Sequence, residues 1–151
     1  MLKEAGSSVR YALFIFAGLV AYFLILRLVG LHENPWLRLF NGVIVSFGIY
    51  SSIRFYKADQ DEDFSYGGGF KTGLLTGFIA TVLFVVFMAI YMYHIDPAFV
   101  DALLDYWKSS YAQGPGILIA ILIIEGFASS VVLTLAFMQL FKKSRNITQT
   151  T

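Results

Sequence analysis

The chain has no cysteine, only three prolines in 151 residues, and charged residues at just 14%. The absence of cysteine excludes a disulfide framework, a thiolate metal site, a thiol nucleophile and a lipidated cysteine. The eleven basic residues nearly balance the ten acidic ones, whereas a nucleic-acid partner requires a basic excess on one face. These absences exclude several classes of enzyme, and they exclude nucleic acid as a partner.

Apolar surface, by contrast, is abundant. Apolar residues make up 58% of the chain, far more than a soluble domain of 151 residues can bury. We therefore expect an all-α polytopic membrane protein, a single integral membrane domain over residues 1–151. Apolar runs predict four transmembrane helices in an antiparallel bundle, packed in sequence order, at about residues 10–29, 36–53, 70–93 and 117–141.

The segments between these predicted spans are short. Asn34 followed by Pro35 is typical of an N-cap and a first helical position, so the first two spans form a hairpin. Residues 54–64 are polar and acidic and predict an aqueous loop, and the triple glycine at 67–69 predicts a flexible start to the third span. Apolar residues recur at helical spacing between charges over about residues 97–112, which predicts an amphipathic helix on the membrane surface.

Basic residues predict the orientation, because acidic residues contribute little to topology. With a cytoplasmic N-terminus, eight basic residues face the cytoplasm and three face the other side, so we expect both termini to be cytoplasmic. The eight are Lys3, Arg10, Arg54, Lys57, Lys71, Lys142, Lys143 and Arg145, and the three are Arg27, Arg38 and Lys108.

Glycines in the third predicted span mark a helix-packing face. Gly69, Gly73 and Gly77 are four residues apart and therefore lie on one side of a helix. Small residues on one face let two helix backbones approach closely in a membrane. We expect this face to pack against the fourth span through Gly126 and Ser130.

The fourth span contains one carboxylate, Glu125, about eight residues from its start. At that depth an unpaired carboxylate costs a few kcal/mol or more. The residue shares an arc of the helix with Gly126, Ser129, Ser130 and Ala136, which predicts that it faces other helices and not lipid. As a proton or cation site it would have Arg27 as its counter-ion. Three roles remain open: fixing helix packing, pairing with a partner subunit or ligand, and carrying protons or cations.

The central block FSYGGGFKTGLLTGFIATVLFVVFMAIYMYHIDPAFVD resembles a family of bacterial four-span membrane proteins described as a domain of unknown function (family 4199). Its members share an aromatic, glycine-rich segment before the third span and an aspartate-proline after it, matched here by Phe64 to Lys71 and by Asp96-Pro97. The resemblance implies four helices in a bacterial inner (plasma) membrane. It carries no catalytic residues to this chain.

The sequence shows no catalytic constellation, and we expect no metal and no cofactor. His32 and His94 come from separate loops without metal-ligand spacing, although with nearby carboxylates they leave open a zinc enzyme acting on lipid-linked substrates. We expect a non-enzymatic scaffold, accessory subunit or self-associating bundle whose partners are the lipid bilayer and either itself or a larger membrane complex. The alternative is a small transporter or channel with Glu125 as a titrating site, although the chain lacks internal repeats and mid-span prolines.

Overall fold

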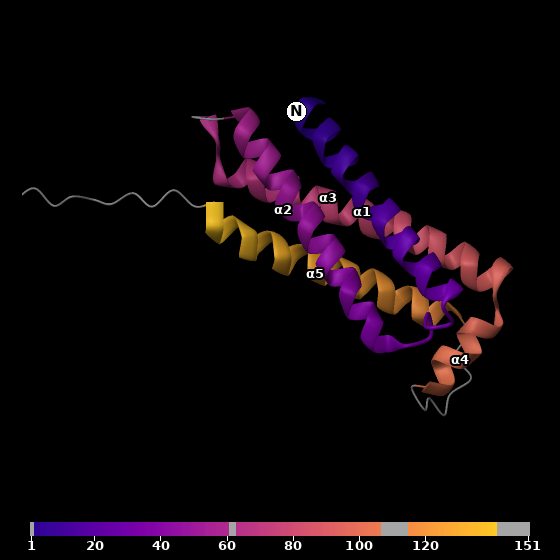
Figure 1. Cartoon of the computed structure of the whole chain (residues 1–151). Helices are drawn as coiled ribbons and strands as arrows, with labels where there is room; N and C mark the ends of the chain where they lie inside the picture. The colour runs from indigo at the N-terminus through magenta and orange to yellow at the C-terminus, as the bar shows by residue number, and fades with distance from the viewer. Residues whose placement is uncertain (1, 61–62, 107–114, 142–151) are drawn as a thin grey trace, which may run out of the picture.

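A computed structural model describes residues 2–60, 63–106 and 115–141, and these segments are helical almost throughout (Figure 1). Four segments are long and apolar enough to cross a membrane: residues 6–28, 36–60, 66–95 and 115–141. This confirms the all-α fold with four membrane spans expected from the sequence. The elements are α1 (Leu2–Leu28), the 3-10 helix η1 (Pro35–Arg38), α2 (Leu39–Gln60), α3 (Tyr66–Ile90), the π-helical turn η3 (Tyr91–Ile95), α4 (Ala98–Tyr106) and α5 (Pro115–Phe141).

Helix α3 lies at the centre of the bundle. It packs against α1, α2 and α5, and α2 in turn packs against α1 and α5 (Figure 1). Successive spans are therefore neighbours. Two pairs of non-consecutive spans are also in contact: α1 with α3, and α2 with α5. Two ends of the bundle can be named from this arrangement: the N-terminal end, where α1 begins, and the α4 end, where α4 covers the helices (Figure 1).

Two predicted non-helical segments are helical in the structure. The predicted loop at 54–64 is wrong over residues 54–60, because α2 continues to Gln60 and this stretch contains no glycine or proline. The predicted flexible triple glycine is also wrong, because Gly67, Gly68 and Gly69 lie inside α3. Ser65 caps this helix by accepting a hydrogen bond from the Gly68 N–H at 3.1 Å.

The glycine face of α3 packs directly on α5. Gly69 lies against Met138, Gly73 against Thr134 and Gly77 against Ser130. A side chain at Gly73 or Gly77 would overlap Thr134 or Ser130, and one at Gly69 would lie tightly against Met138. All three α5 residues are fully buried. Close backbone approach of this kind is how membrane helices gain packing energy without a hydrophobic driving force between them.

Polar side chains join α3 to α2 on its other side. Ser52 and Thr76 are both fully buried, and their hydroxyl oxygens lie 2.8 Å apart in a hydrogen bond. The Thr76 hydroxyl also contacts the Thr72 carbonyl at 2.8 Å within α3. Because these groups are satisfied inside the bundle, they bind the two helices together where lipid offers no alternative partner.

The amphipathic helix α4 covers one end of the bundle. Its apolar residues Phe99, Val100 and Leu103 are buried. The Asp96 carboxylate accepts hydrogen bonds from the Tyr91 hydroxyl at 3.0 Å and from the Phe99 N–H at 3.2 Å, so it joins η3 to the first turn of α4. The predicted surface helix at 97–112 is thus described from Ala98 to Tyr106, and its remaining part lies outside the described residues.

Candidate functional site

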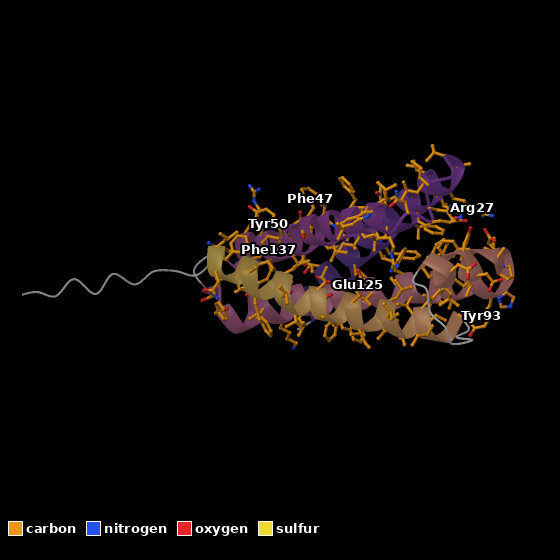
Figure 2. All side chains as sticks on the ribbon, turned by 90° about the horizontal axis from the view of Figure 1, so that it is seen from below. Arg27, Phe47, Tyr50, Tyr93, Glu125 and Phe137 are labelled. Carbon is orange, nitrogen blue, oxygen red and sulfur yellow. The ribbon has the colours of Figure 1, made fainter. Side chains whose placement is uncertain are left out.

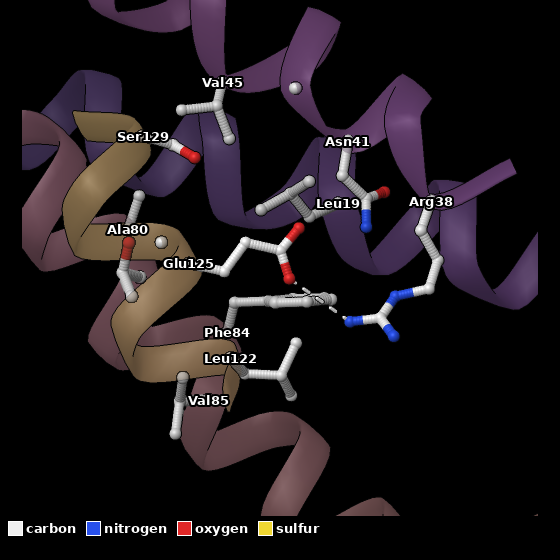
Figure 3. A pocket seen from close by; sticks show the side chains of 13 residues that line it. Leu19, Arg38, Asn41, Val45, Ala80, Phe84, Val85, Leu122, Glu125 and Ser129 are labelled. Atoms are coloured by element: carbon white, nitrogen blue, oxygen red, sulfur yellow. Dashed lines mark ion pairs between the residues drawn. The ribbon is translucent and has the colours of Figure 1, made fainter. Parts of the chain in front are cut away.

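A groove between α2 and α5 contains the carboxylate of Glu125 (Figure 3). Its cavity is about 90 Å³, and residues from all four long helices line it. Since one water needs roughly 10–15 Å³ measured in this way, the groove has space for several waters or for side chains of another molecule. Its main lining residues are Leu19, Arg38, Asn41, Gly42, Phe84 and Glu125.

The groove begins where direct contact between α2 and α5 ends. Toward the N-terminal end of the bundle, the Tyr50 ring packs on Phe137 with centroids 5.5 Å apart and on Phe141 at 5.6 Å. Figure 2 shows Tyr50 and Phe137 together there, and Glu125 near the middle of the bundle's length. Toward the α4 end, the groove takes the place of these aromatic contacts between the two helices.

Glu125 forms an ion pair with Arg38 across the groove, with a carboxylate oxygen 3.5 Å from a guanidinium nitrogen (Figure 3). The Glu125 side chain is 58% exposed on the single chain, and that of Arg38 is 25% exposed. Glu125 is ten residues from the start of α5, about 15 Å along the helix axis. The carboxylate is therefore paired on one side and open on the other at a depth normally occupied by lipid chains.

Arg38 owes its position to the cap at the start of the second span. The Asn34 side chain accepts a hydrogen bond from the Trp36 N–H at 3.0 Å, and Pro35 begins the 3-10 helix that Arg38 ends. This turn leads directly into α2, so its last residue lies at the α4 end of the groove and reaches toward Glu125. The sequence indicated the cap, but it gave no reason to prefer Arg38 as the counter-ion.

The expected pairing of Glu125 with Arg27 is wrong. The Arg27 guanidinium lies 4.9 Å from the centre of the Tyr91 ring, in a cation–π contact at the end of the bundle (Figure 2). The reason is the packing of the helices: the end of α1 lies against Tyr91 of η3, whereas the start of α2 lies across the groove from Glu125. Arg27 therefore lies against Tyr91, whose ring packs with those of Phe23 and Phe99, and it is not among the residues that line the groove.

The arc predicted around Glu125 divides into two faces. Ser130 and Gly126 face α3: Ser130 is fully buried and donates a hydrogen bond to the Gly126 carbonyl at 2.7 Å, and Gly126 lies against Thr81. Ser129 lines the groove with Glu125, and Gly126 lies between the two faces, because it also lines the groove. At about 100° of rotation per residue, position 129 is close to 125 around the helix, whereas position 130 is well over a quarter turn away.

A smaller cavity of about 40 Å³ continues the groove toward α4. It shares Arg38, Asn41 and Phe84 with the groove and is also lined by His32 and Phe99. The His32 ring stacks on Phe99 with centroids 5.2 Å apart, and its Nδ1 is buried without a hydrogen-bond partner among the described residues. Within the described ranges, no three His, Cys, Asp or Glu residues are grouped so that they could bind a metal.

Four membrane-length helices define a polytopic α-helical membrane protein, and the partly exposed Arg38–Glu125 ion pair lies in a groove between them. The chain belongs to the family described as "Protein of unknown function (DUF4199)", which matches residues 10–143. No curated protein and no solved structure matches the chain.

Proposed function

We propose that this protein is a non-enzymatic inner-membrane subunit of a bacterium that works by binding other membrane helices, as an accessory subunit, scaffold or self-associating bundle. One observation carries the proposal: Glu125 is 58% exposed at a depth where the single chain meets lipid. A carboxylate facing hydrocarbon is costly, and Arg38 covers it from one side only. A protein partner seated over the groove would cover the open side.

The surface around Glu125 is suited to close helix contact. Val132, seven residues further along α5, lies on the same face as Glu125 and is 64% exposed. Ser129 and Ala136 continue this face on α5, and the exposed Gly42 lies across the groove on α2. Small residues beside a polar pair are typical of surfaces at which membrane helices associate.

The proposed orientation has both termini in the cytoplasm. Arg10, Arg54 and Lys57 belong to the N-terminal end of the bundle, where Arg10 lies over Phe55 and Lys57 over Phe141. Cationic groups beside aromatic rings are typical of helix ends at the membrane surface. Under this orientation the groove opens in the outer half of the membrane; Lys108, Lys142, Lys143 and Arg145, which also support it, lie outside the described residues.

A photo-crosslinking side chain at Val132 tests whether a protein covers the groove. In membranes of the producing cell, we expect the Val132 variant to form a protein adduct, because the partner lies over this face. The matched control is Val82 on α3, which is 50% exposed on a different face and should react with lipid. The Val132 adduct should also disappear when Glu125 is changed to leucine. Lipid adducts alone at Val132, or equal protein adducts at both valines, would contradict the proposal.

A second candidate, a small transporter or channel with Glu125 as a proton or cation site, is favoured by the space for water beside the carboxylate. Against it, the lining of the groove ends at Ser129, and the following turns of α5 pack directly on the glycine face of α3. A path across the membrane would then require several copies. Proton or cation flux into vesicles that Glu125→Gln abolishes would favour this candidate over a binding role.

A further inference from the structure

We infer that the partner in the groove is a second copy of this chain, related by a two-fold axis, with Arg38 of each copy on Glu125 of the other. The inference rests on the proposed function and names the partner of the same site. It concerns the region between α2 and α5 where the two charged side chains lie 3.5 Å apart (Figure 3).

The charges in the groove of one copy are complementary to those in the groove of a second copy. A two-fold interface places the same patch on both copies, so a patch of one sign would repel its own image. Here one acidic and one basic group lie side by side, and a rotation of 180° about an axis between them brings Glu125 over Arg38 of the other copy. The two chains would then share four alternating charges, each with opposite charges as neighbours.

The intrachain pair leaves hydrogen-bonding capacity unused. A carboxylate can accept about four hydrogen bonds, and a guanidinium can donate five. Across the described residues, the 3.5 Å contact with Arg38 is the one polar contact found for the Glu125 carboxylate, and it is longer than a strong charge-assisted hydrogen bond. A second Arg38 would supply donors on the open side, where the single chain supplies none.

The shape of the groove rim also permits close approach. Gly42 is exposed and lines the groove, and a side chain added there would meet nothing within 4 Å in the single chain. Near a two-fold axis beside Arg38, each Gly42 would face the other copy. The glycine therefore has no packing role inside the chain, but its lack of a side chain matters at the proposed interface.

Two charge-reversal variants test the exchange. The chain with Glu125→Arg carries two basic groups in the groove, and the chain with Arg38→Glu carries two acidic groups. We expect each variant alone in lipid nanodiscs to associate about tenfold or more weakly than the unchanged chain, because like charges then face each other. A mixture of the two, with different tags, should form mixed dimers that approach the unchanged chain in strength.

Gly42→Leu gives an independent test that does not alter charge. This variant should keep its helix content and thermal stability but remain monomeric. The leucine side chain meets open space in the single chain, whereas in the dimer it would collide with the same leucine of the second copy. The control is Gly67→Leu on α3, where an added side chain also meets nothing within 4 Å; it should remain dimeric. Monomeric unchanged protein, no mixed dimers, or a dimeric Gly42→Leu variant would overturn the inference.

The outcomes separate this inference from the proposed function. If Val132 crosslinks to a different membrane protein while the purified chain stays monomeric in nanodiscs, the partner is not a second copy and the proposed function stands. If the purified chain is monomeric and Val132 reacts with lipid alone, both fail.

Discussion

Replacing Gly77 with leucine is expected to lower the free energy of unfolding by about 2–3 kcal/mol, in the upper part of the range for overpacking a core. A side chain at Gly77 would overlap the side chain of Ser130, which is fully buried and bonded to its own helix. Neither the new leucine side chain nor Ser130 can move aside without separating α3 from α5. In a chain of this size the loss corresponds to a fall in Tm of roughly 5–10 °C, measurable by thermal unfolding in mild detergent.

Gly67→Leu is the matched control for this prediction. Gly67 lies in the first turns of the same helix, and an added side chain there meets nothing within 4 Å. Its Tm should stay close to that of the unchanged protein. Equal melting temperatures for the Gly77 and Gly67 variants would show that α3 and α5 do not pack through the glycine face.

Replacing Arg38 with leucine is the second large change. It leaves the Glu125 carboxylate without its counter-ion, and we expect a loss of about 1–2 kcal/mol, near the upper range for polar pairs between membrane helices. Changing both Arg38 and Glu125 to leucine should be less damaging than Arg38→Leu alone, because no unpaired charge then remains. Thermal unfolding of the two single variants and the double variant gives the coupling energy directly.

Arg27→Leu provides the comparison for the Arg38 series. Arg27 lies over the Tyr91 ring and makes no ion pair with Glu125 in the described part of the chain. The change in the free energy of unfolding caused by Arg27→Leu should add to that caused by Glu125→Leu, whereas the changes caused by Arg38→Leu and Glu125→Leu should not be additive. Strong coupling of Glu125 to Arg27 in place of Arg38 would contradict the geometry of the groove.

The fold was largely predictable because its main signals are local. Four long apolar runs could be interpreted without knowing how the helices pack, and a spacing of four residues placed Gly69, Gly73 and Gly77 on one face. The contact of Gly77 with Ser130 follows from the same periodicity on α5. Periodicity along a helix is thus a reliable guide to which residues share a face.

The counter-ion of Glu125 was not predictable, because it depends on which helix ends lie side by side. Arg27 and Arg38 are both basic residues near the same end of the bundle, and their sequence positions give no preference between them. The packing decides between them, because the start of α2 lies across the groove from Glu125, while the end of α1 lies against Tyr91 of η3. The exposed position of Glu125 was not predictable for a similar reason, because the residues of this wide arc of α5 face two different neighbours.

A polar or glycine-rich sequence does not by itself predict a loop. Residues 54–60 continue α2, since a helix can extend beyond its apolar part when nothing interrupts it. The glycines at 67–69 are helical because Ser65 caps the helix, and Gly68 and Gly69 pack against Tyr56 and Met138. Tertiary contacts of this kind override the low helix propensity of glycine.

The central claim is that two copies of this chain associate through the groove beside Glu125. Disulfide trapping at position 42 tests it most directly. The chain has no cysteine, so a single Gly42→Cys variant has no background reaction. Oxidised in its own membrane, it should give a covalent species of twice the 16.9 kDa chain mass, whereas Val82→Cys on α3 should not. No dimer from Gly42→Cys, or equal dimer from both variants, would contradict it.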